Sequence, residues 1–218
     1  MTEVQAIRDR FASLKFFDAT AENGTLEILH ASFIADEDEI FGTLNEDYAR
    51  RELNWYLSQS LNIDGLDPVP QIWKDIADKD GMINSNYGWC IFSKENGHQF
   101  STAINTLVED PASRQASMIY NRPSMHVDSK LNGMKDFMCT YAVQMMIRNN
   151  VLVYIVYMRS NDAVFGYKND LYWHRFVHRS AFESLKNHYP NLTLGYIHWN
   201  AASLHVYPRH FHLIGDQL

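Results

Sequence analysis

The chain has 218 residues, 46% hydrophobic and 21% charged, which is typical of a soluble globular protein with one substantial core. The net charge of -7 argues against a broad nucleic-acid-binding surface, because binding a phosphate backbone needs clustered lysine and arginine. No apolar run approaches the ~20 residues of a membrane span, and the N-terminus lacks the basic and apolar regions of a signal peptide. We therefore expect a single domain over residues 1–218, in the cytoplasm, without a membrane or nucleic-acid partner.

The first half of the chain is predicted to be mainly helical. Apolar residues recur at near-helical spacing over 4–17, which predicts an amphipathic helix. The stretch 25–34 alternates and is rich in strand-forming residues, so it predicts the first strand of a sheet. The same periodicity predicts further helices over 47–60, 71–77 and 100–109.

The second half supplies the rest of the sheet. A strand is predicted over 116–121, and the continuous apolar run within 149–158 is typical of a strand that is buried on both faces. A helical period over 170–186 predicts a helix that covers one face of the sheet, and further strands are predicted over 192–198 and 204–207. Strands and long helices in one chain indicate an α/β (α+β) fold.

One cysteine is a candidate nucleophile. The chain has two cysteines, Cys90 and Cys139, which lie far apart without CxxC spacing and suggest neither a disulfide framework nor a zinc site. Cys139 lies between an acidic turn and an apolar run, and Arg159 and Ser160 follow about twenty residues later. A lone cysteine is more often a small buried hydrophobe. A thiolate followed closely by anion-binding residues instead indicates attack on an electron-poor carbon of a phosphorylated substrate.

Three motifs together resemble the thymidylate synthase superfamily, and most closely its phage-type deoxycytidylate hydroxymethylase branch, over nearly the whole chain. Residues 136–144 are similar to the nucleophile turn of the family, with Cys139 at the catalytic position and Gln144 at the family's glutamine. Residues 158–162 are similar to its arginine-serine-x-aspartate phosphate motif, and residues 203–207 to its histidine-x-tyrosine motif. The resemblance implies a mixed β-sheet flanked by helices and a homodimer that pairs sheet to sheet.

The resemblance also implies roles for three residues in the first half. Glu52 would reach the catalytic pocket, organise water and proton transfer, and contact the folate. Tyr87 would belong to the proton-transfer network beside the nucleophile, and Trp73 would line the folate pocket. Without the resemblance, these would be a solvated helix-face glutamate, a turn tyrosine and a core aromatic residue.

The remaining residues would bind the nucleotide. Arg159 and Ser160 would hold the phosphate, joined by Arg114 of the other subunit, while His205 and Tyr207 would hold the sugar 3′-hydroxyl. The family's motifs also place Asp162, Gly166 and Gln144 in the substrate site, with Asp162 shared with the folate.

Position 170 decides the base. Uracil-specific synthases have asparagine here, whereas an ionised Asp170 can only accept a hydrogen bond, as the exocyclic amino group of cytosine requires. A buried carboxyl would have a raised pKa, and in its protonated form could also donate to ring N3. We therefore predict a cytosine nucleotide, although the adjacent Asn169 would take this position if the alignment shifted by one residue.

The implied reaction is one-carbon transfer to C5 of dCMP. Cys139 adds to C6 of the cytosine, C5 takes the one-carbon unit from 5,10-methylenetetrahydrofolate, and water completes the 5-hydroxymethyl product; no metal takes part. The sequence leaves open a dCMP C5-methylase, which would differ only in the last step, and ribose instead of deoxyribose.

Two departures from the family concern the phosphate site and the folate pocket. The second of two adjacent family arginines is Gln115 here, for which Arg122 is a candidate replacement, and Ala21 and Glu22 stand near the place of another family arginine. Ile76 replaces a second pocket tryptophan, which fits a pocket open to water.

Two other classes of protein are alternatives. A histidine-metal hydrolase is suggested by the histidines near the C-terminus, but their spacing fits no known zinc motif. An inactive nucleotide-binding protein is disfavoured because Cys139, Tyr87, Glu52 and Asp170 are all present. The histidines in question are His198, His205, His210 and His212.

Overall fold

The computed structural model describes residues 1–215, whose contacts divide into two compact units. Unit 1 contains Met1–Asn45 and the C-terminal part of the chain from Ile147 onward, and unit 2 contains Glu46–Met146. A single domain over residues 1–218 stays a prediction. Among the described residues, no helix is both long and apolar enough to cross a membrane.

Unit 1 is built on a mixed sheet. Its longest strand, β6 (Thr193–Val206), pairs antiparallel with β1 (Leu26–Ile34) and parallel with β4 (Val151–Met158). The two-residue strand β5 (Asn161–Asp162) also pairs parallel with β6. A parallel pair needs a crossover connection, and the helix α7 (Gly166–Leu185) supplies it between β4 and β6.

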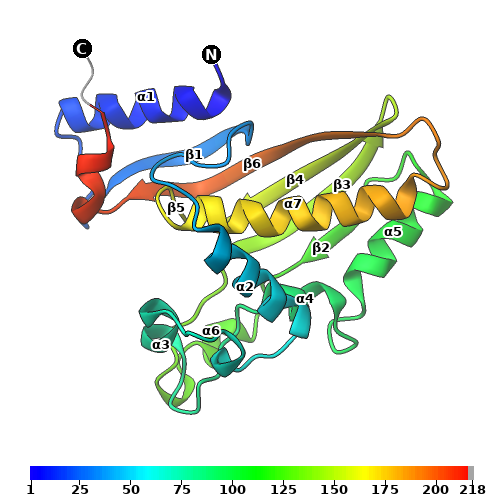
Figure 1. Ribbon diagram of the computed structural model, residues 1–218, viewed down its shortest axis with the longest axis horizontal. Helices are drawn as coiled ribbons and strands as arrows, with labels where there is room; N and C mark the ends of the chain where they lie inside the picture. The colour runs from blue at the N-terminus through cyan, green and yellow to red at the C-terminus, as the bar shows by residue number, and fades with distance from the viewer. Residues whose placement is uncertain (216–218) are drawn as a thin grey trace. The chain divides into compact units, whose positions relative to one another are not determined.

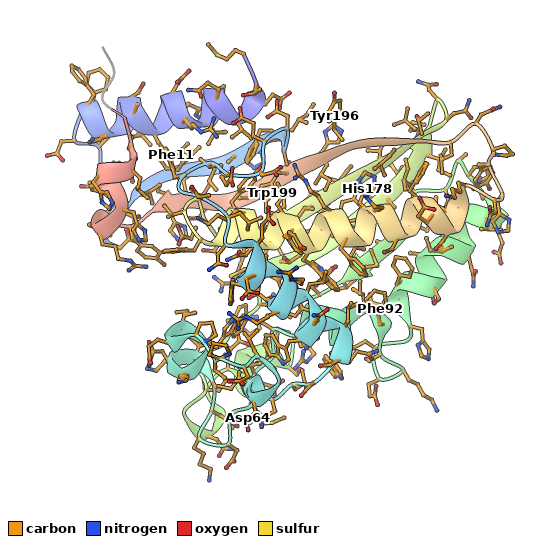
Figure 2. The ribbon with its side chains drawn as sticks, in the orientation of Figure 1. Phe11, Asp64, Phe92, His178, Tyr196 and Trp199 are labelled. Carbon is orange, nitrogen blue, oxygen red and sulfur yellow. The ribbon has the colours of Figure 1, made fainter. Side chains whose placement is uncertain are left out.

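Helices cover this sheet because their apolar faces need burial. In Figure 1, α7 runs along β4 and β6. Trp199 of β6 packs edge-on against Tyr167 and His174 of α7, with ring centroids 5.2 and 5.6 Å apart (Figure 2). The helix α1 (Glu3–Phe16) lies along β1 and begins at Thr2, whose side chain accepts the Gln5 N–H as an N-cap.

Unit 2 combines helices with an antiparallel strand pair. Gly88 is essential to its packing, because a Cβ there would lie 1.9 Å from the carbonyl oxygen of Tyr56. The absence of a side chain therefore lets the helix that contains Gly88 approach the helix that contains Tyr56. The elements are α2 (Glu46–Ser58), η1 (Ile63–Gly65), α3 (Gln71–Ile76), α4 (Tyr87–Phe92), α5 (Gln99–Glu109), α6 (Met125–Asp128), η2 (Leu131–Gly133) and the strands β2 (Ser117–Ile119) and β3 (Thr140–Arg148).

Most of the predicted elements are confirmed to within a few residues, and so is a mixed sheet flanked by helices. The strand predicted within 149–158 begins after Asn149 and Asn150, whose φ angles of 51° and 61° suit the two-residue turns that precede such strands. The sheet-to-sheet homodimer stays a prediction.

Two predicted boundaries were wrong. The strands expected over 192–198 and 204–207 form one continuous strand, β6. The polar residues in the middle of β6 interrupt the apolar pattern, so the sequence predicted two strands. In the structure Asn200 is accommodated in the sheet because its side-chain amide donates to the Val156 carbonyl at 3.2 Å. Tyr87, for which a turn was an alternative, is instead the first residue of a helix, α4, because Asn86 caps this helix by accepting the Trp89 N–H at 2.8 Å.

Candidate active site

The residues predicted to form the site fall into two groups, one in each unit. Unit 2 holds the predicted nucleophile and proton-transfer residues, and unit 1 holds most of the predicted nucleotide-binding residues. The first group is Glu52, Trp73, Tyr87, Arg114, Cys139 and Gln144, and the second is Arg159, Ser160, Asp162, Gly166, Asp170, His205 and Tyr207.

The turn that carries Cys139 is anchored by a buried carboxylate. Asp136 accepts the backbone N–H groups of Asn84 and Ser85, both at 2.7 Å, and the Ser85 hydroxyl at 2.6 Å. Asp136 is only 4% exposed, so these bonds offset the cost of burying its charge. They fix the chain three residues before Cys139, which is half-buried directly before β3.

The other cysteine is unsuited to nucleophilic chemistry. Cys90 is buried in α4, and burial raises the pKa of its thiol to about 12. It therefore stays protonated near neutral pH, and a thiol is a much weaker nucleophile than a thiolate. Cys139 is the cysteine that remains partly accessible to solvent.

Tyr87 lies beside the nucleophile turn. Its phenol oxygen accepts a hydrogen bond from the hydroxyl of Thr140, the residue after Cys139, at 3.1 Å. The ring stacks on Tyr56 of α2 with centroids 5.0 Å apart. The phenol is therefore held against the residue that follows Cys139.

Glu52 is a buried carboxyl group with a strongly raised pKa. It is 6% exposed on α2, and burial raises its pKa to about 7, an increase that is limited by donors on Tyr48 and Trp73. The Tyr48 hydroxyl donates to Glu52 Oε1 from one helical turn away. A carboxyl group with a pKa near 7 can accept and release a proton at neutral pH, which suits a general acid or base.

Trp73 supports this carboxyl group. Its indole N–H donates to the Tyr48 oxygen at 3.0 Å, and its ring packs edge-on against Trp55 with centroids 5.1 Å apart. With only 9% of its surface exposed, Trp73 is also a core residue of unit 2. The position that departs from the family, Ile76, lies half-buried at the end of the same helix, α3.

The predicted phosphate residue of unit 2 is solvent-exposed. Arg114 has an exposed side chain, while its backbone carbonyl accepts the Gln144 amide at 2.6 Å. Gln144 therefore ties β3 to the segment that carries Arg114. The proposed substitute for the missing second arginine, Arg122, is engaged locally: it donates to Asn84 at 2.6 Å and lies over the Trp89 ring at 5.0 Å.

In unit 1, the phosphate motif lies where β4 ends. Arg159 and Ser160 are half-buried and connect β4 to β5. Asp162 follows in β5, and its carboxylate accepts the Val164 N–H at 2.9 Å, which closes a turn before α7.

The pairing of β5 with β6 brings the histidine motif to this loop. Asp162 is aligned with His205 in the parallel register, and the Ala163 N–H donates to the His205 carbonyl at 2.8 Å. Burial lowers the pKa of the His205 imidazole, with Asp162 and Glu27 opposing this effect. His205 therefore favours the neutral form, which can both donate and accept hydrogen bonds. The ring of the partly exposed Tyr207 meets it at 5.0 Å.

Asp170 lies in the first turns of α7, where it meets a residue that the sequence did not single out. The Asn161 side-chain amide donates to Asp170 Oδ2 at 2.9 Å. Gly166 lies between them in the chain, and its missing side chain leaves room for this contact. Asn161 occupies the variable position of the phosphate motif, so the motif itself gave no signal for it.

Tyr48 and Thr140 were also missed. Tyr48 precedes Glu52 by four residues on a predicted helix, a spacing that places both on one face and could have revealed the pair. Thr140 follows Cys139 directly, but nothing in the sequence joins it to Tyr87, 53 positions earlier.

Two histidines of α7, His174 and His178, are buried in unit 1. Burial lowers the pKa of His174 to about 3 and that of His178 to about 4, so both are neutral at physiological pH. His178 contacts the Leu152 carbonyl at 3.1 Å (Figure 2). Across residues 1–215, no group of three or more His, Cys, Asp or Glu side chains is arranged to hold a metal ion.

Known proteins are similar to this chain over most of its length. Deoxycytidylate 5-hydroxymethyltransferase of Enterobacteria phage T6 is 47% identical over 193 residues, which cover 87% of this chain and 78% of the relative. The phage T4 enzyme of the same name is 46% identical over the same shares. Thymidylate synthase of Francisella tularensis is 26% identical over 178 residues, 77% of this chain and 63% of the relative.

Structural comparison agrees on the fold. Thermostable thymidylate synthase A from Bacillus subtilis superposes with a TM-score of 0.65 at 22% identity, covering 86% of this chain and 68% of the other. The family model for thymidylate synthase matches residues 44–218. The chain therefore belongs to the thymidylate synthase family.

Proposed function

We propose that this chain is a transferase that converts dCMP, 5,10-methylenetetrahydrofolate and water to 5-hydroxymethyl-dCMP and tetrahydrofolate. The observation that supports the proposal is the carboxylate of Asp170, which accepts a hydrogen bond from Asn161 and stands where the family's motif is expected to read the base. The phage relatives that are 47% and 46% identical carry the name deoxycytidylate 5-hydroxymethyltransferase, which supports the same conclusion.

The nucleophile of the proposed reaction is Cys139. Its thiolate adds to C6 of the cytosine ring, which makes C5 nucleophilic. Methylenetetrahydrofolate supplies the one-carbon unit that bonds to C5. As the C5 proton leaves, the bond between the one-carbon unit and the folate nitrogen breaks and tetrahydrofolate departs, which leaves an exocyclic methylene group on C5. Water then adds to this methylene group and the Cys139 thiolate leaves C6. The position of Cys139, half-buried beside the anchored Asp136 turn, supports this role.

The proposed proton-transfer residues are Glu52 and Tyr87. Glu52 has a pKa of about 7, raised by burial, so it can exchange protons with ordered water near neutral pH. Tyr87 is held one residue from Cys139 by Thr140, where a phenol can relay a proton or donate a hydrogen bond.

Asp170 is proposed to select the base. Its carboxylate accepts a hydrogen bond from the amino group at C4 of cytosine. Uracil has a carbonyl oxygen at C4, which is also an acceptor, so no hydrogen bond could form there. The neutral acid could donate to ring N3 of cytosine, but it could equally donate to O4 and accept N3–H of uracil, so the proposed selection of cytosine rests on the ionised carboxylate.

The sugar and phosphate contacts are proposed from the family's motifs. Arg159 and Ser160 bind the phosphate, because a guanidinium and a hydroxyl supply charge-assisted donors. The neutral tendency of His205 suits a hydrogen bond to the 3′-hydroxyl, together with Tyr207. We further propose a homodimer in which Arg114, exposed within one chain, reaches the phosphate of its partner.

The residues near Glu52 fit a reduced folate in part. Trp73 offers only the 9% of its surface that is exposed, because it packs on Trp55 and donates to Tyr48. The half-buried Ile76 is smaller than the tryptophan of the synthases, which leaves more room for water. Glu52 and Asp162 would supply acceptors for the amino and amide N–H groups of a pterin. We place the reaction in the cytoplasm of a bacterial or phage-infected cell.

The test is to incubate the protein with methylenetetrahydrofolate and either dCMP, CMP or dUMP, and to identify the products by mass spectrometry. The proposal predicts 5-hydroxymethyl-dCMP and tetrahydrofolate, with dCMP turned over faster than CMP or dUMP. A 5-methyl product with dihydrofolate would instead identify a methylase. Absence of any product with all three nucleotides would refute the proposed function.

A further inference from the structure

A buried asparagine contacts the proposed base-reading residue. Asn161 is the first residue of β5 and is 2% exposed. Its Nδ2 donates to Oδ2 of Asp170 at 2.9 Å, across nine positions of the chain. Hydrogen bonds to a charged acceptor are stronger and more directional than neutral ones, so this contact restricts rotation of the carboxylate.

The other end of the same amide is unsatisfied. Asn161 Oδ1 is buried and has no hydrogen-bond partner within the part of the chain that the structure describes. Leaving a buried acceptor unpaired is unfavourable for folding. If position 161 served stability alone, we would expect an apolar side chain, or an amide with hydrogen bonds at both its nitrogen and its oxygen. The hydrogen bond to Asp170 therefore explains why an asparagine is present here.

The surrounding backbone is adapted to this contact. A Cβ on Gly166 would lie 3.0 Å from Asn161 Nδ2 and 3.6 Å from Asp170 Oδ2. Any side chain at Gly166 would therefore press on the amide where it meets the carboxylate. Glycine at the first position of α7 leaves the two groups in hydrogen-bond contact.

We propose that Asn161 is a positioning residue that fixes the carboxylate of Asp170 for discrimination between cytosine and uracil nucleotides, an inference that rests on the proposed function of Asp170. One lone pair of Oδ2 is engaged by the amide, and the remaining acceptor positions of the carboxylate are then held in fixed directions. Without Asn161 the carboxylate loses the restraint that this hydrogen bond supplies at Oδ2, and a water molecule can take the place of the amide and bridge to uracil O4. Discrimination against uracil falls, whereas contacts with the sugar and phosphate do not change.

The test compares dissociation constants for dCMP, dUMP and deoxyribose 5-phosphate, which lacks a base, in the parent protein and in Asn161→Leu and Asn161→Ala. The parent is expected to prefer dCMP, and each variant is expected to lose about tenfold of that preference, equivalent to one charge-assisted hydrogen bond. Affinity for deoxyribose 5-phosphate should stay within about twofold of the parent, a change much smaller than one such hydrogen bond.

Thermal unfolding separates this role from a structural one. Asn161→Leu keeps the approximate volume and removes the unpaired Oδ1, which offsets the loss of the hydrogen bond to the half-buried Asp170, so its melting temperature should stay close to that of the parent. The matched control is Asn200→Ala, which removes another side-chain amide bond of the same sheet, to the Val156 carbonyl, without touching Asp170. This control should keep the parent's preference for dCMP.

Two outcomes would overturn the inference: both Asn161 variants keeping the parent's preference, or a loss of deoxyribose 5-phosphate binding as large as that of dCMP. Because binding needs no turnover, these results are independent of the reaction. A parent protein that prefers dCMP through Asn161 but makes no product would contradict the proposed function alone. A parent that makes 5-hydroxymethyl-dCMP with Asn161 variants of unchanged preference would contradict the inference alone.

Discussion

Burial of the Glu52 carboxyl group lowers the stability of the fold at neutral pH and raises its pKa into the range that the proposed proton transfer needs. Burial favours its protonated form and raises the pKa to about 7, and the hydroxyl of Tyr48 and the indole of Trp73 limit that increase. In the unfolded chain the same group titrates near 4.5. Between pH 4.5 and about 7, therefore, Glu52 is mostly protonated in the folded state and mostly ionised in the unfolded state.

The first prediction follows from this difference in pKa. The stability associated with protonated Glu52 is fully present below pH 4.5 and is lost as the pH rises through about 7. Relative to the parent, Glu52→Gln should gain free energy of unfolding across this range, by about 3 kcal/mol at its upper end. Chemical unfolding at several pH values measures the gain, and Glu46→Gln, an exposed residue of the same helix, is the control. Parallel pH profiles for parent and Glu52→Gln would contradict a buried carboxyl with a raised pKa.

The second prediction concerns the nucleophile. Cys139→Ser should lower turnover of dCMP by at least about 10⁴-fold, because a hydroxyl is far less nucleophilic than a thiolate at neutral pH, while dCMP still binds. Cys90→Ser is the matched control, since Cys90 is buried and its pKa is raised to about 12. Steady-state kinetics and calorimetric binding distinguish the two steps. Turnover that persists in Cys139→Ser would rule out covalent attack by this residue.

At the scale of elements, the turn before β3 depends on one carboxylate that joins distant segments. Asp136 receives hydrogen bonds from Asn84 and Ser85, directly before the Asn86 cap of α4. This arrangement places Tyr87 and Cys139, which are 52 positions apart in sequence, on two segments that share an anchor.

The third prediction tests this anchor. Asp136→Ala should destabilise the protein by about 3 kcal/mol, because buried backbone donors at two residues lose their acceptor. Turnover should fall more than the loss of stability alone explains, because the turn that carries Cys139 is no longer fixed. Asp64→Ala, at an exposed aspartate of the same unit (Figure 2), should leave both unchanged. Equal stability of the two variants would mean that the turn is held by other contacts.

Local sequence predicted the elements well where one face of each is apolar. The helices α1, α2 and α5 and the strands β1 and β4 follow directly from periodicity. The continuity of β6 was missed because its polar residues pair inside the sheet through side chains such as Asn200, and periodicity carries no information on such partners. The helix α4 was missed because Gly88, unfavourable in a helix, is there for close packing on Tyr56.

At the scale of the whole molecule, the sequence motifs named the chemical groups but not their supports. Cys139, Glu52, Asp170 and His205 were predicted from resemblance. Their supporting contacts involve residues such as Asn161, which lie at variable positions of the motifs and become adjacent to their targets through β5 and α7. The contact of Asn161 with Asp170 depends on tertiary structure and no local pattern could have shown it, whereas the i,i+4 spacing of Tyr48 and Glu52 on one helix could have revealed that pair.

The fourth prediction concerns assembly. If Arg114 completes the phosphate site of a partner, then Arg114→Ala and Cys139→Ser are each inactive alone, but a mixed dimer contains one site with both native residues. Unfolding and refolding the two variants together should restore about a quarter of parental turnover for random pairing in a two-fold symmetric dimer. Arg148→Ala, assayed alone, is the control for loss of an arginine and should keep the turnover of the parent. If the mixture is no more active than its components, the shared site is wrong.

The most direct test of the central claim, hydroxymethylation with water as the final nucleophile, is the reaction of dCMP and methylenetetrahydrofolate in water enriched in heavy oxygen. If water is the final nucleophile, the products are 5-hydroxymethyl-dCMP whose new hydroxyl carries the heavy isotope, and tetrahydrofolate. A 5-methyl product without the isotope, accompanied by dihydrofolate, would contradict this claim.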